Sequence, residues 1–462
     1  MQVSVGSGRS FAFRLLVSLL VAVAAYALVC APADARSIRV ASAGPGPEEF
    51  DGVDVYQYGP KKPRRVLVLM PGTGGGAGNF ALVAKDLVRR VDGLAVWSVD
   101  RRSQPLEDTS RFEQALAGEI TPDAAFDYYL GWITNGGQPA DHYRFFDTDD
   151  APFATEWGMG TALDDVRRVV SRARGTGPRR PKVFLGGHSL GASLAAAYAA
   201  WDFDGRAGFK DLAGIVMIDG GLLGSFDAYD LEEAQEQVAT LEDDPFLDLL
   251  GIGIPESAGL FAEAGAIFAG ADPDGAATTI QEFPLLPEAF KPDVPVTNRG
   301  LLGYVFDRDS SPEELALLHV NAGGLADQGD PRDWIEGGVT RSADLAKVFG
   351  REPANGVEWF FPRRLTIDTN GADQMRQNDV AEYLGLRLEH TREIDIPIYA
   401  FQTDLTNGGV LTGAKRLVKR ARTTPKQSLL VDGDPRFSHL DPLTATPAKN
   451  LFAQSVARFL RR

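Results

Sequence analysis

Cysteine is almost absent from this chain of 462 residues, because Cys30 is the only one. Cys30 falls within the first 35 residues, which have the pattern of a removable export signal. A mature chain that begins at Arg36 has no cysteine at all. This excludes a disulfide, a thiolate nucleophile and a cysteine metal site in the mature protein.

The export signal has its three parts in the expected order. Arg9 and Arg14 form a positive n-region, residues 15–31 are an apolar run, and Ala33-Asp34-Ala35 is a small-x-small site that signal peptidase accepts. The apolar run is short for a segment that crosses a bilayer. We therefore expect residues 1–35 to be cleaved and the protein to be secreted, periplasmic or at the cell surface. An uncleaved N-terminal membrane anchor is the alternative.

Basic residues are also scarce: 47 lysines and arginines stand against 63 aspartates and glutamates, which gives a formal net charge of −16. A surface of this sign repels phosphate backbones, so nucleic acid is excluded as a partner. No long apolar run follows Arg36, so membrane contact is expected only through the N-terminal segment. The 44% of hydrophobic and 24% of charged residues are typical of a globular protein.

Short β-type apolar runs alternate with helical stretches through most of the chain. Buried strands are predicted at 66–70, 94–99, 182–186, 215–218, 396–401 and 428–431. Helical patterns separate them, and the clearest are 161–174 and 190–200. This alternation predicts an α/β fold with a mostly parallel sheet that is flanked by helices on both faces.

The alternation stops between residues 222 and 393, where mostly helical segments and Pro/Gly loops follow one another. We therefore expect residues 36–221 and 394–462 to form one α/β core, with 222–393 inserted between two of its strands as a helical cap or lid. The predicted cap is rich in aromatic residues. Most of them are expected to form its own core, and some to line a pocket for an apolar substrate.

The segment Gly187-His188-Ser189-Leu190-Gly191 stands between a predicted strand and a predicted helix. It fits the pattern G-x-S-x-G, in which a serine on a tight, strained turn lifts its hydroxyl clear of the backbone. The two glycines leave room for the neighbouring strand and helix. An ordinary glycine-rich turn is the alternative, but the strand before and the helix after favour Ser189 as a nucleophile. His188 is expected to support the turn, with its side chain pointing away from the hydroxyl.

On these residues the chain resembles the α/β-hydrolase superfamily, over about residues 36–221 and 394–462. The resemblance implies the α/β-hydrolase fold and a serine esterase, a lipase or a related acyl-transfer enzyme. It also implies that the catalytic residues follow one another along the chain in the order nucleophile, acid, histidine.

The candidate base is the histidine that follows the last predicted strand. Of five histidines, only His439 lies in a loop after that strand, where it can reach a serine at the carboxyl edge of the sheet. Two aspartates at strand ends are candidate acids. Asp404 follows the strand 396–401 and is in the usual position for the family, so it is preferred. Asp219, at the end of the strand 215–218, is the alternative.

A glycine-rich loop, residues 71–78, follows the first buried strand. In the family, the equivalent loop gives one backbone N–H to the oxyanion, and the residue after the nucleophile gives the other. By resemblance, these are the N–H groups of Thr73 and Leu190.

The same loop also fits a dinucleotide-binding fingerprint, as Gly72-x-Gly74-x-x-Ala77 with Asp100 at the end of the next strand. This would make the protein a dinucleotide-dependent oxidoreductase. The export signal, the unexplained serine motif and the strand expected before residue 66 weigh against that interpretation.

We therefore expect a secreted serine hydrolase that cleaves carboxylic ester bonds of a small-molecule or lipid-like substrate through Ser189, His439 and Asp404. No cofactor is needed for this chemistry. No metal site is expected either, because the acidic turns at 147–150 and 272–275 lack the full spacing of a calcium loop. Peptidase, thioesterase, lactonase or acyltransferase chemistry stays open, as does a non-catalytic binding protein of the same fold.

Overall fold

An eight-stranded sheet organises the chain. The computed structural model describes residues 35–462, except 135–140, 226 and 352–353. The strand order is β1-β2-β4-β3-β5-β6-β9-β10. The strands are β1 (Arg36–Val40), β2 (Val53–Tyr58), β3 (Arg65–Met70), β4 (Leu94–Val99), β5 (Lys182–His188), β6 (Gly214–Ile218), β9 (Ile398–Gln402) and β10 (Leu429–Asp432). β2 is antiparallel to both of its neighbours, and all other neighbours are parallel. The predicted mostly parallel α/β sheet is confirmed.

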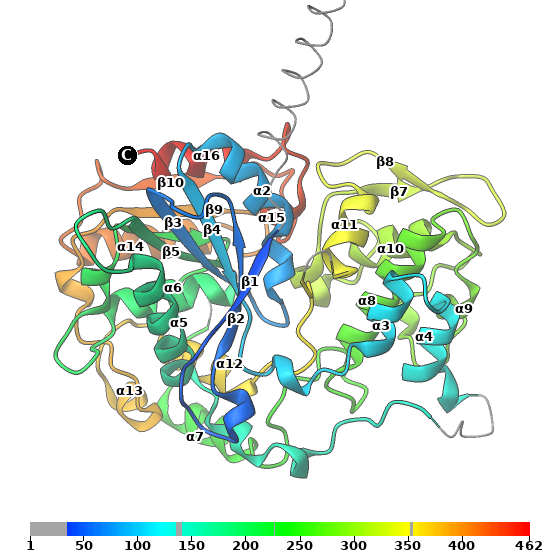
Figure 1. The fold of residues 1–462 in the computed structure, drawn as a ribbon, viewed down its shortest axis with the longest axis horizontal. Helices are drawn as coiled ribbons and strands as arrows, with labels where there is room; N and C mark the ends of the chain where they lie inside the picture. The colour runs from blue at the N-terminus through cyan, green and yellow to red at the C-terminus, as the bar shows by residue number, and fades with distance from the viewer. Residues whose placement is uncertain (1–34, 135–140, 226, 352–353) are drawn as a thin grey trace, which may run out of the picture. The chain divides into compact units, whose positions relative to one another are not determined.

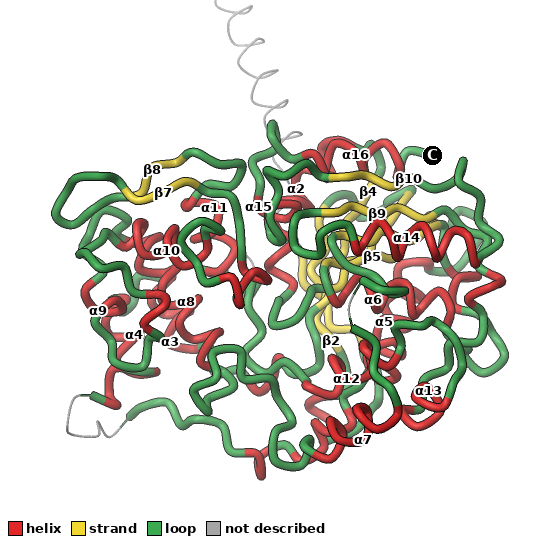
Figure 2. Tube along the Cα trace, turned by 180° about the vertical axis from the view of Figure 1, so that it is seen from behind, coloured by secondary structure: helices red, strands yellow, loops and turns green. Residues whose placement is uncertain are grey.

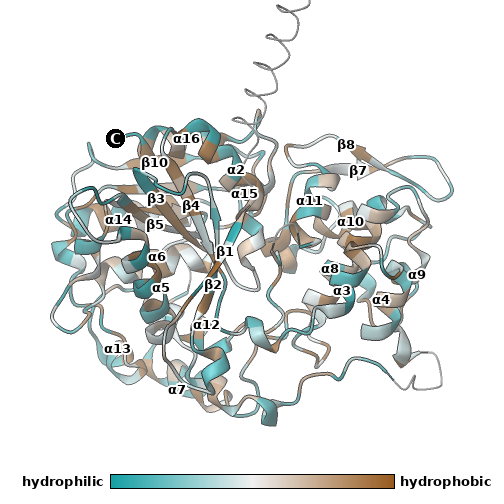
Figure 3. Ribbon diagram, viewed as in Figure 1, coloured by the Kyte–Doolittle hydropathy of each residue, from teal (hydrophilic) through white to brown (hydrophobic). Residues whose placement is uncertain are grey.

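The central strands are mostly apolar, as strands with both faces covered require. In β3, every residue from Val66 to Met70 is at most 3% exposed. Figure 3 shows hydrophobic residues along β3 and β5. Parallel strands bring their carboxyl ends to one edge of the sheet, where ligands of such folds bind. The residues that follow β3, β4, β5, β6 and β9 therefore meet there.

Helices cover both faces of the sheet (Figure 1). One face carries α5 (Met159–Arg174), α6 (Leu190–Ala200) and α14 (Gly409–Arg420), and the same apolar core includes α7 (Leu231–Ala239), α12 (Arg363–Gly371) and α13 (Asp379–Leu384). The other face carries α2 (Ala81–Arg90) and α16 (Leu451–Leu460), and the short α15 (Asp441–Thr444) packs on α2. The expected helices on both faces are therefore present.

A second group of helices, named here the α8 bundle, packs around α8 (Ser257–Ala271). Its other members are α3 (Ser110–Leu116), α4 (Pro122–Tyr129), α9 (Thr278–Gln281), α10 (Asn298–Phe306) and α11 (Ser342–Phe349), with the hairpin of β7 (Gly323–Leu325) and β8 (Trp334–Glu336). Its interior includes the buried rings of Phe126, Phe261 and Phe268. Figures 1 and 2 show the bundle beside the sheet from opposite sides.

The α8 bundle differs in its boundaries from the predicted cap of residues 222–393. Helices α3 and α4 come from the segment between β4 and α5, yet they pack on α8. Conversely, α12 and α13 fall within 222–393, but their residues Leu365, Val380 and Leu384 belong to the core beside the sheet. The reason is physical: an apolar helix face predicts burial, but its periodicity does not say which of two cores buries it.

Residues 1–34, which make up almost all of the predicted export signal, lie outside the described residues. Among the described residues, no helix combines the length and the apolar character that crossing a bilayer requires. Cleavage and export therefore stay predictions from the sequence.

Candidate active site

Ser189 occupies the sharp turn between β5 and α6. Its φ of 54° and ψ of −126° are a conformation that residues other than glycine rarely adopt. Its backbone N–H donates to the carbonyl of Ile218, at the end of the neighbouring β6, over 2.8 Å. The residue is only 3% exposed. The turn therefore has the strained strand-to-helix form that the sequence predicts.

Four glycines make room for this turn. A Cβ at Gly187 would lie 2.3 Å from the backbone of Gly191, and a Cβ at Gly191 would lie 2.2 Å from a carbonyl oxygen at the end of β3. A Cβ at Gly72 would lie 2.7 Å from the Cβ of Ser189, and one at Gly220 would lie 2.0 Å from the carbonyl oxygen of Ser189. The two glycines of the serine motif are thus required by packing.

His439 and Asp219 form a buried pair. Nδ1 of His439 lies 2.6 Å from Oδ2 of Asp219, and the two residues are 2% and 0% exposed. Thr403 donates its backbone N–H to Oδ1 of Asp219 over 2.7 Å and its hydroxyl to Oδ2. Burial by itself would raise the pKa of the Asp219 carboxyl, but the hydrogen bonds from His439 and Thr403 outweigh burial and lower that pKa. Asp219 is therefore the carboxylate that orients the imidazole.

Asp404, the preferred acid in the sequence prediction, does not reach His439. Its carboxylate accepts a hydrogen bond from the Ser438 hydroxyl over 3.0 Å and lies 3.6 Å from a guanidinium nitrogen of Arg308. The Asp404 side chain is 42% exposed. The expected pairing of Asp404 with His439 is thus corrected by the geometry to the alternative, Asp219.

The correction has a simple structural cause. β6 and β9 are neighbouring parallel strands, and both end at the same edge of the sheet. Asp219 follows β6 directly, whereas Thr403 separates the end of β9 from Asp404. Thr403 takes the place beside Asp219, and the chain then turns Asp404 towards the surface.

The loop that carries His439 is held from two sides. The backbone N–H of Ser438 donates to the carboxylate of Asp441 over 2.7 Å, and the N–H of Leu440 donates to the carbonyl of His319 over 3.0 Å. Asp441 is fully buried, and burial raises its pKa to about 7. Because His319 follows α10 in the chain, these contacts tie the loop to the α8 bundle.

His188 supports His439 directly. The centroids of the two rings are 4.3 Å apart, and Nε2 of His188 lies 2.8 Å from the backbone carbonyl oxygen of His439. A carbonyl only accepts, so Nε2 of His188 carries the hydrogen and donates it. Burial, together with the neighbouring His439, lowers the pKa of His188 to about 3. These contacts agree with the supporting role that the sequence predicts, and His188 is also among the residues that line the cavity of Ser189.

Arg101 holds the glycine loop and was not predicted from the sequence. Its guanidinium donates to the carbonyls of Pro71, Gly72 and Gly75 over 2.8, 2.9 and 3.0 Å, and it forms an ion pair with Glu358. The available signal was its position, because Arg101 follows β4 and the carboxyl ends of β4 and β3 are neighbours.

The contact of Arg101 with Gly72 also orients the N–H of Thr73. In a trans peptide unit, the carbonyl and the next N–H point in opposite directions, so the N–H of Thr73 points away from Arg101. Thr73 and Ser189 line the same cavity. The N–H of Leu190, at the first position of α6, has no acceptor within the helix. Within the described part of the chain, neither N–H donates to a backbone carbonyl. Both therefore remain the candidate oxyanion donors that the sequence predicts.

Asp100, the acid of the alternative dinucleotide fingerprint, faces inward. It is 2% exposed, and its carboxylate accepts the backbone N–H of Ala77 over 2.5 Å. The N–H of Gly76 also has a protein acceptor, the carbonyl of Gly356. A dinucleotide-binding acid instead presents its carboxylate to a ribose. The geometry therefore argues against the dinucleotide interpretation.

One cavity joins the site to the α8 bundle. Ser189, His188, His439 and Thr73 line it together with mostly apolar side chains: Leu249, Leu250, Leu315, Leu317, Leu318, Phe349 and Val357. Among the described residues that line it, only the two histidines have an acidic or basic side chain. Such walls favour an uncharged, apolar ligand.

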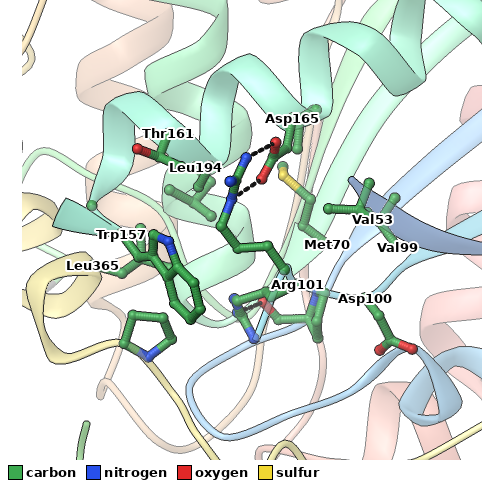
Figure 4. A pocket seen from close by; sticks show the side chains of 16 residues that line it. Val53, Met70, Val99, Asp100, Arg101, Trp157, Thr161, Asp165, Leu194 and Leu365 are labelled. Atoms are coloured by element: carbon green, nitrogen blue, oxygen red, sulfur yellow. Dashed lines mark hydrogen bonds and ion pairs between the residues drawn. The ribbon is translucent and has the colours of Figure 1, made fainter. Parts of the chain in front are cut away.

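A separate cavity at the end of β4 does not belong to this site (Figure 4). Trp157, Leu194 and Leu365 contribute to its walls, and neither Ser189 nor His439 lines it. The dashed lines in Figure 4 lead to Asp165, which forms a buried ion pair with Arg102.

One group among the described residues has side chains spaced for a metal ion: Asp202, Glu389 and His390. None of them lines the cavity of Ser189. The ring nitrogens of His390 are within hydrogen-bond distance of Asp202 and Glu393, at 2.9 and 3.1 Å. Two members of the group, Asp202 and His390, are thus paired with each other.

No protein-family model and no curated protein matches the chain. Among solved structures, it is similar to a putative lipase from Sulfolobus solfataricus, with 13% identity and a TM-score of 0.46 over 93% of this chain and 99% of that one. It is also similar to an epoxide hydrolase from an endophytic Streptomyces, with 10% identity and a TM-score of 0.43 over 93% and 96%. A thioesterase domain from the curacin biosynthetic pathway has 13% identity and a TM-score of 0.38 over 93% and 99%.

These likenesses are weak, and the fold is established by the molecule's own features. They are the mostly parallel sheet covered on both faces, the serine on a strained strand-to-helix turn, and a histidine after the last strand that is paired with an aspartate at a strand end. The chain therefore has the α/β-hydrolase fold.

Proposed function

We propose that the protein is a serine hydrolase that cleaves carboxylic esters, with Ser189 as nucleophile, His439 as base and Asp219 as the orienting acid. One observation carries the proposal. The strained, buried Ser189 opens into the same cavity as His439, whose Nδ1 is engaged by a fully buried carboxylate. A nucleophile, a base and a third group that orients the base are the parts that acyl transfer requires.

The proton transfers follow from the tautomer of His439. Its Nδ1–H donates to Asp219, so the other ring nitrogen, Nε2, takes the hydroxyl proton as Ser189 attacks the ester carbonyl. Nε2 then gives this proton to the leaving alkoxide, and an acyl-enzyme stays on Ser189. Water, activated by the same nitrogen, releases the acid. The lowered pKa of Asp219 keeps it ionised and able to stabilise the imidazolium.

The oxyanion is stabilised by the backbone N–H groups of Thr73 and Leu190. Arg101 preorganises the first of these by binding the carbonyl of Gly72, and the second is at the N-terminus of α6. Each donor contributes about 3 kcal/mol to the stabilisation of the transition state. The same groups serve an ester or a thioester. The apolar walls favour an uncharged substrate over a charged peptide.

Export is part of the proposal and is supported by the N-terminal sequence alone. A mature protein without cysteine keeps its fold whatever the redox state of its surroundings. N-terminal sequencing of the protein recovered from its native host would test this. A mature N-terminus at Arg36 supports export with cleavage, and an intact N-terminus supports an anchor.

The decisive experiment is covalent labelling of the purified protein with a fluorophosphonate probe, read by intact mass. The wild type is expected to gain one adduct, Ser189→Ala none, and the matched control Ser193→Ala one. Ser193 is a buried serine on the same helix whose hydroxyl donates to the carbonyl of Gly221. A folded wild-type protein that takes up no probe would contradict the proposal and favour a non-catalytic binding protein of this fold.

A further inference from the structure

A second cavity lies inside the α8 bundle, and its walls are almost entirely apolar. Phe261, Phe268, Ile280, Leu286 and Phe290 are among the side chains that line it. Asn298 is the only polar side chain among the described residues in its walls, and the amide nitrogen of Asn298 donates to the carbonyl of Asp272. An enclosure of this kind excludes sugars, charged peptides and phosphates, because it offers them no partner for their polar groups. It suits a hydrocarbon chain.

This cavity adjoins the cavity that contains Ser189. Five residues line both of them: Leu250, Ala258, Ala262, Phe306 and Leu318. All five are apolar, so the wall that the two cavities share offers a hydrocarbon chain no polar side chain. The route from Ser189 towards the interior of the α8 bundle is therefore bordered by apolar side chains where the two cavities meet.

Helix α8 lines these cavities with small residues on one of its faces. Ala258, Ala262 and Gly265 follow one another at intervals of four and three residues, which places them on the same side of a helix. The first two line the shared wall, and Gly265 lines the inner cavity. A Cβ at Gly265 would meet only Leu302 Cδ1, at 4.0 Å. Glycine is therefore not required there by packing, and its effect is to leave space.

We propose that the α8 bundle is the acyl-binding part of the enzyme and that the preferred substrates are esters of unbranched, medium- to long-chain fatty acids. The acyl carbonyl lies at Ser189, and the hydrocarbon chain runs past Ala262 into the cavity beside Gly265. The proposal rests on the ester hydrolysis proposed above and adds its substrate class. Each methylene that the cavity buries raises kcat/KM by roughly fourfold until the cavity is full.

The test is a series of p-nitrophenyl esters from acetate to dodecanoate, assayed with the wild type and with Gly265→Ala, Gly265→Val and Gly265→Leu. The wild type is expected to gain in kcat/KM with chain length. In the three variants, the gain in kcat/KM is expected to stop at progressively shorter acyl chains as the new side chain grows. For Gly265→Leu, the ratio of kcat/KM on dodecanoate to kcat/KM on acetate is expected to fall by about tenfold or more. The matched control is Gly270→Leu, which lies on the same helix, is exposed and has open space around its Cα.

Two outcomes would overturn the proposal. One is a wild type that prefers acetate, and the other is a set of Gly265 variants that lose activity equally on all chain lengths. Thermal melts identify a variant that fails to fold, and Gly265→Ala, the smallest change, then carries the comparison. If no ester is hydrolysed at all, binding of methyl decanoate, an uncharged ester, to Ser189→Ala by calorimetry separates the two proposals. Binding that Gly265→Leu abolishes supports the acyl cavity although hydrolysis has failed, and no binding rejects both.

Discussion

Nδ1 of His439 lies 2.6 Å from Oδ2 of Asp219, and 220 residues of chain separate the two. Neither residue is more than 2% exposed. A buried histidine next to a buried carboxylate is costly unless the two are paired, because burial penalises each charge. Thr403 donates two further hydrogen bonds to the carboxylate of Asp219. Several consequences of this arrangement can be measured.

Replacing each aspartate in turn with asparagine shows whether Asp219 or Asp404 is the catalytic acid. Asp219→Asn is expected to lower kcat on a short-chain ester by about a thousandfold or more, because the amide no longer holds the Nδ1–H tautomer of His439. Asp404→Asn removes a charge from a side chain that is 42% exposed, and it is expected to change kcat by no more than about twofold. The reverse pattern would restore Asp404 as the acid.

His188 is expected to act as a positioning residue. His188→Ala removes the donor to the carbonyl of His439, and a loss of about 1 kcal/mol corresponds to a fall in kcat of roughly fivefold with little change in KM. The acidic limb of the pH–rate profile is expected to stay in place, because burial keeps the pKa of His188 at about 3. His188→Asn, which retains an N–H donor, should recover part of the loss. A displaced acidic limb would mean that His188 itself titrates in the catalytic range.

Asp100 is expected to make stability depend on pH. Burial raises the pKa of its carboxyl to about 7 from an ordinary value of 3.8. Between these values the native state holds a proton that the unfolded state releases, so the free energy of unfolding falls as pH rises towards 7. Asp100→Asn removes this dependence and still accepts the N–H of Ala77. Relative to the wild type, the variant should be more stable at pH ~8 than at pH ~5 by about 2 kcal/mol.

The measurement for Asp100 is urea unfolding at the two pH values. Asp92→Asn is the control, because the side chain of Asp92 is 93% exposed. An equal effect of Asp100→Asn at both pH values would show that Asp100 is ionised throughout or accessible to water.

Substitution by alanine is expected to be harmful at Gly187 and stabilising at Gly160. In Gly187→Ala the new Cβ would lie 2.3 Å from the backbone of Gly191, so the turn must move and the labelling of Ser189 is expected to disappear. In Gly160→Ala, within α5, the nearest atom is Trp201 Cζ2 at 3.9 Å. A gain in stability of about 0.5–1 kcal/mol is expected there, with full labelling. Intact labelling in Gly187→Ala would show that the turn tolerates a shift of α6.

Much of this molecule is determined locally by its sequence. Buried parallel strands are continuous apolar runs, so the predicted bounds of β3, β5 and β6 agree with the structure within one or two residues, and α6 has the predicted bounds. The turn at Ser189 was predictable because its close packing requires a glycine two residues before and two residues after the serine, and this requirement is visible in the sequence as a short motif. The histidine was predictable because only His439 follows the last predicted strand in a loop.

The tertiary structure alone decided which aspartate meets His439, which helices surround α8 and that Arg101 binds the glycine loop. These outcomes depend on contacts between segments that are far apart in the chain. Asp219 and Asp404 both follow strands that end at the same edge of the sheet. Thr403, which precedes Asp404 in the chain, binds Asp219, so Asp219 and not Asp404 meets His439. Likewise, the periodicity of an apolar helix face predicts that it is buried but not where. Local pattern determines the elements, and packing between distant elements determines the site.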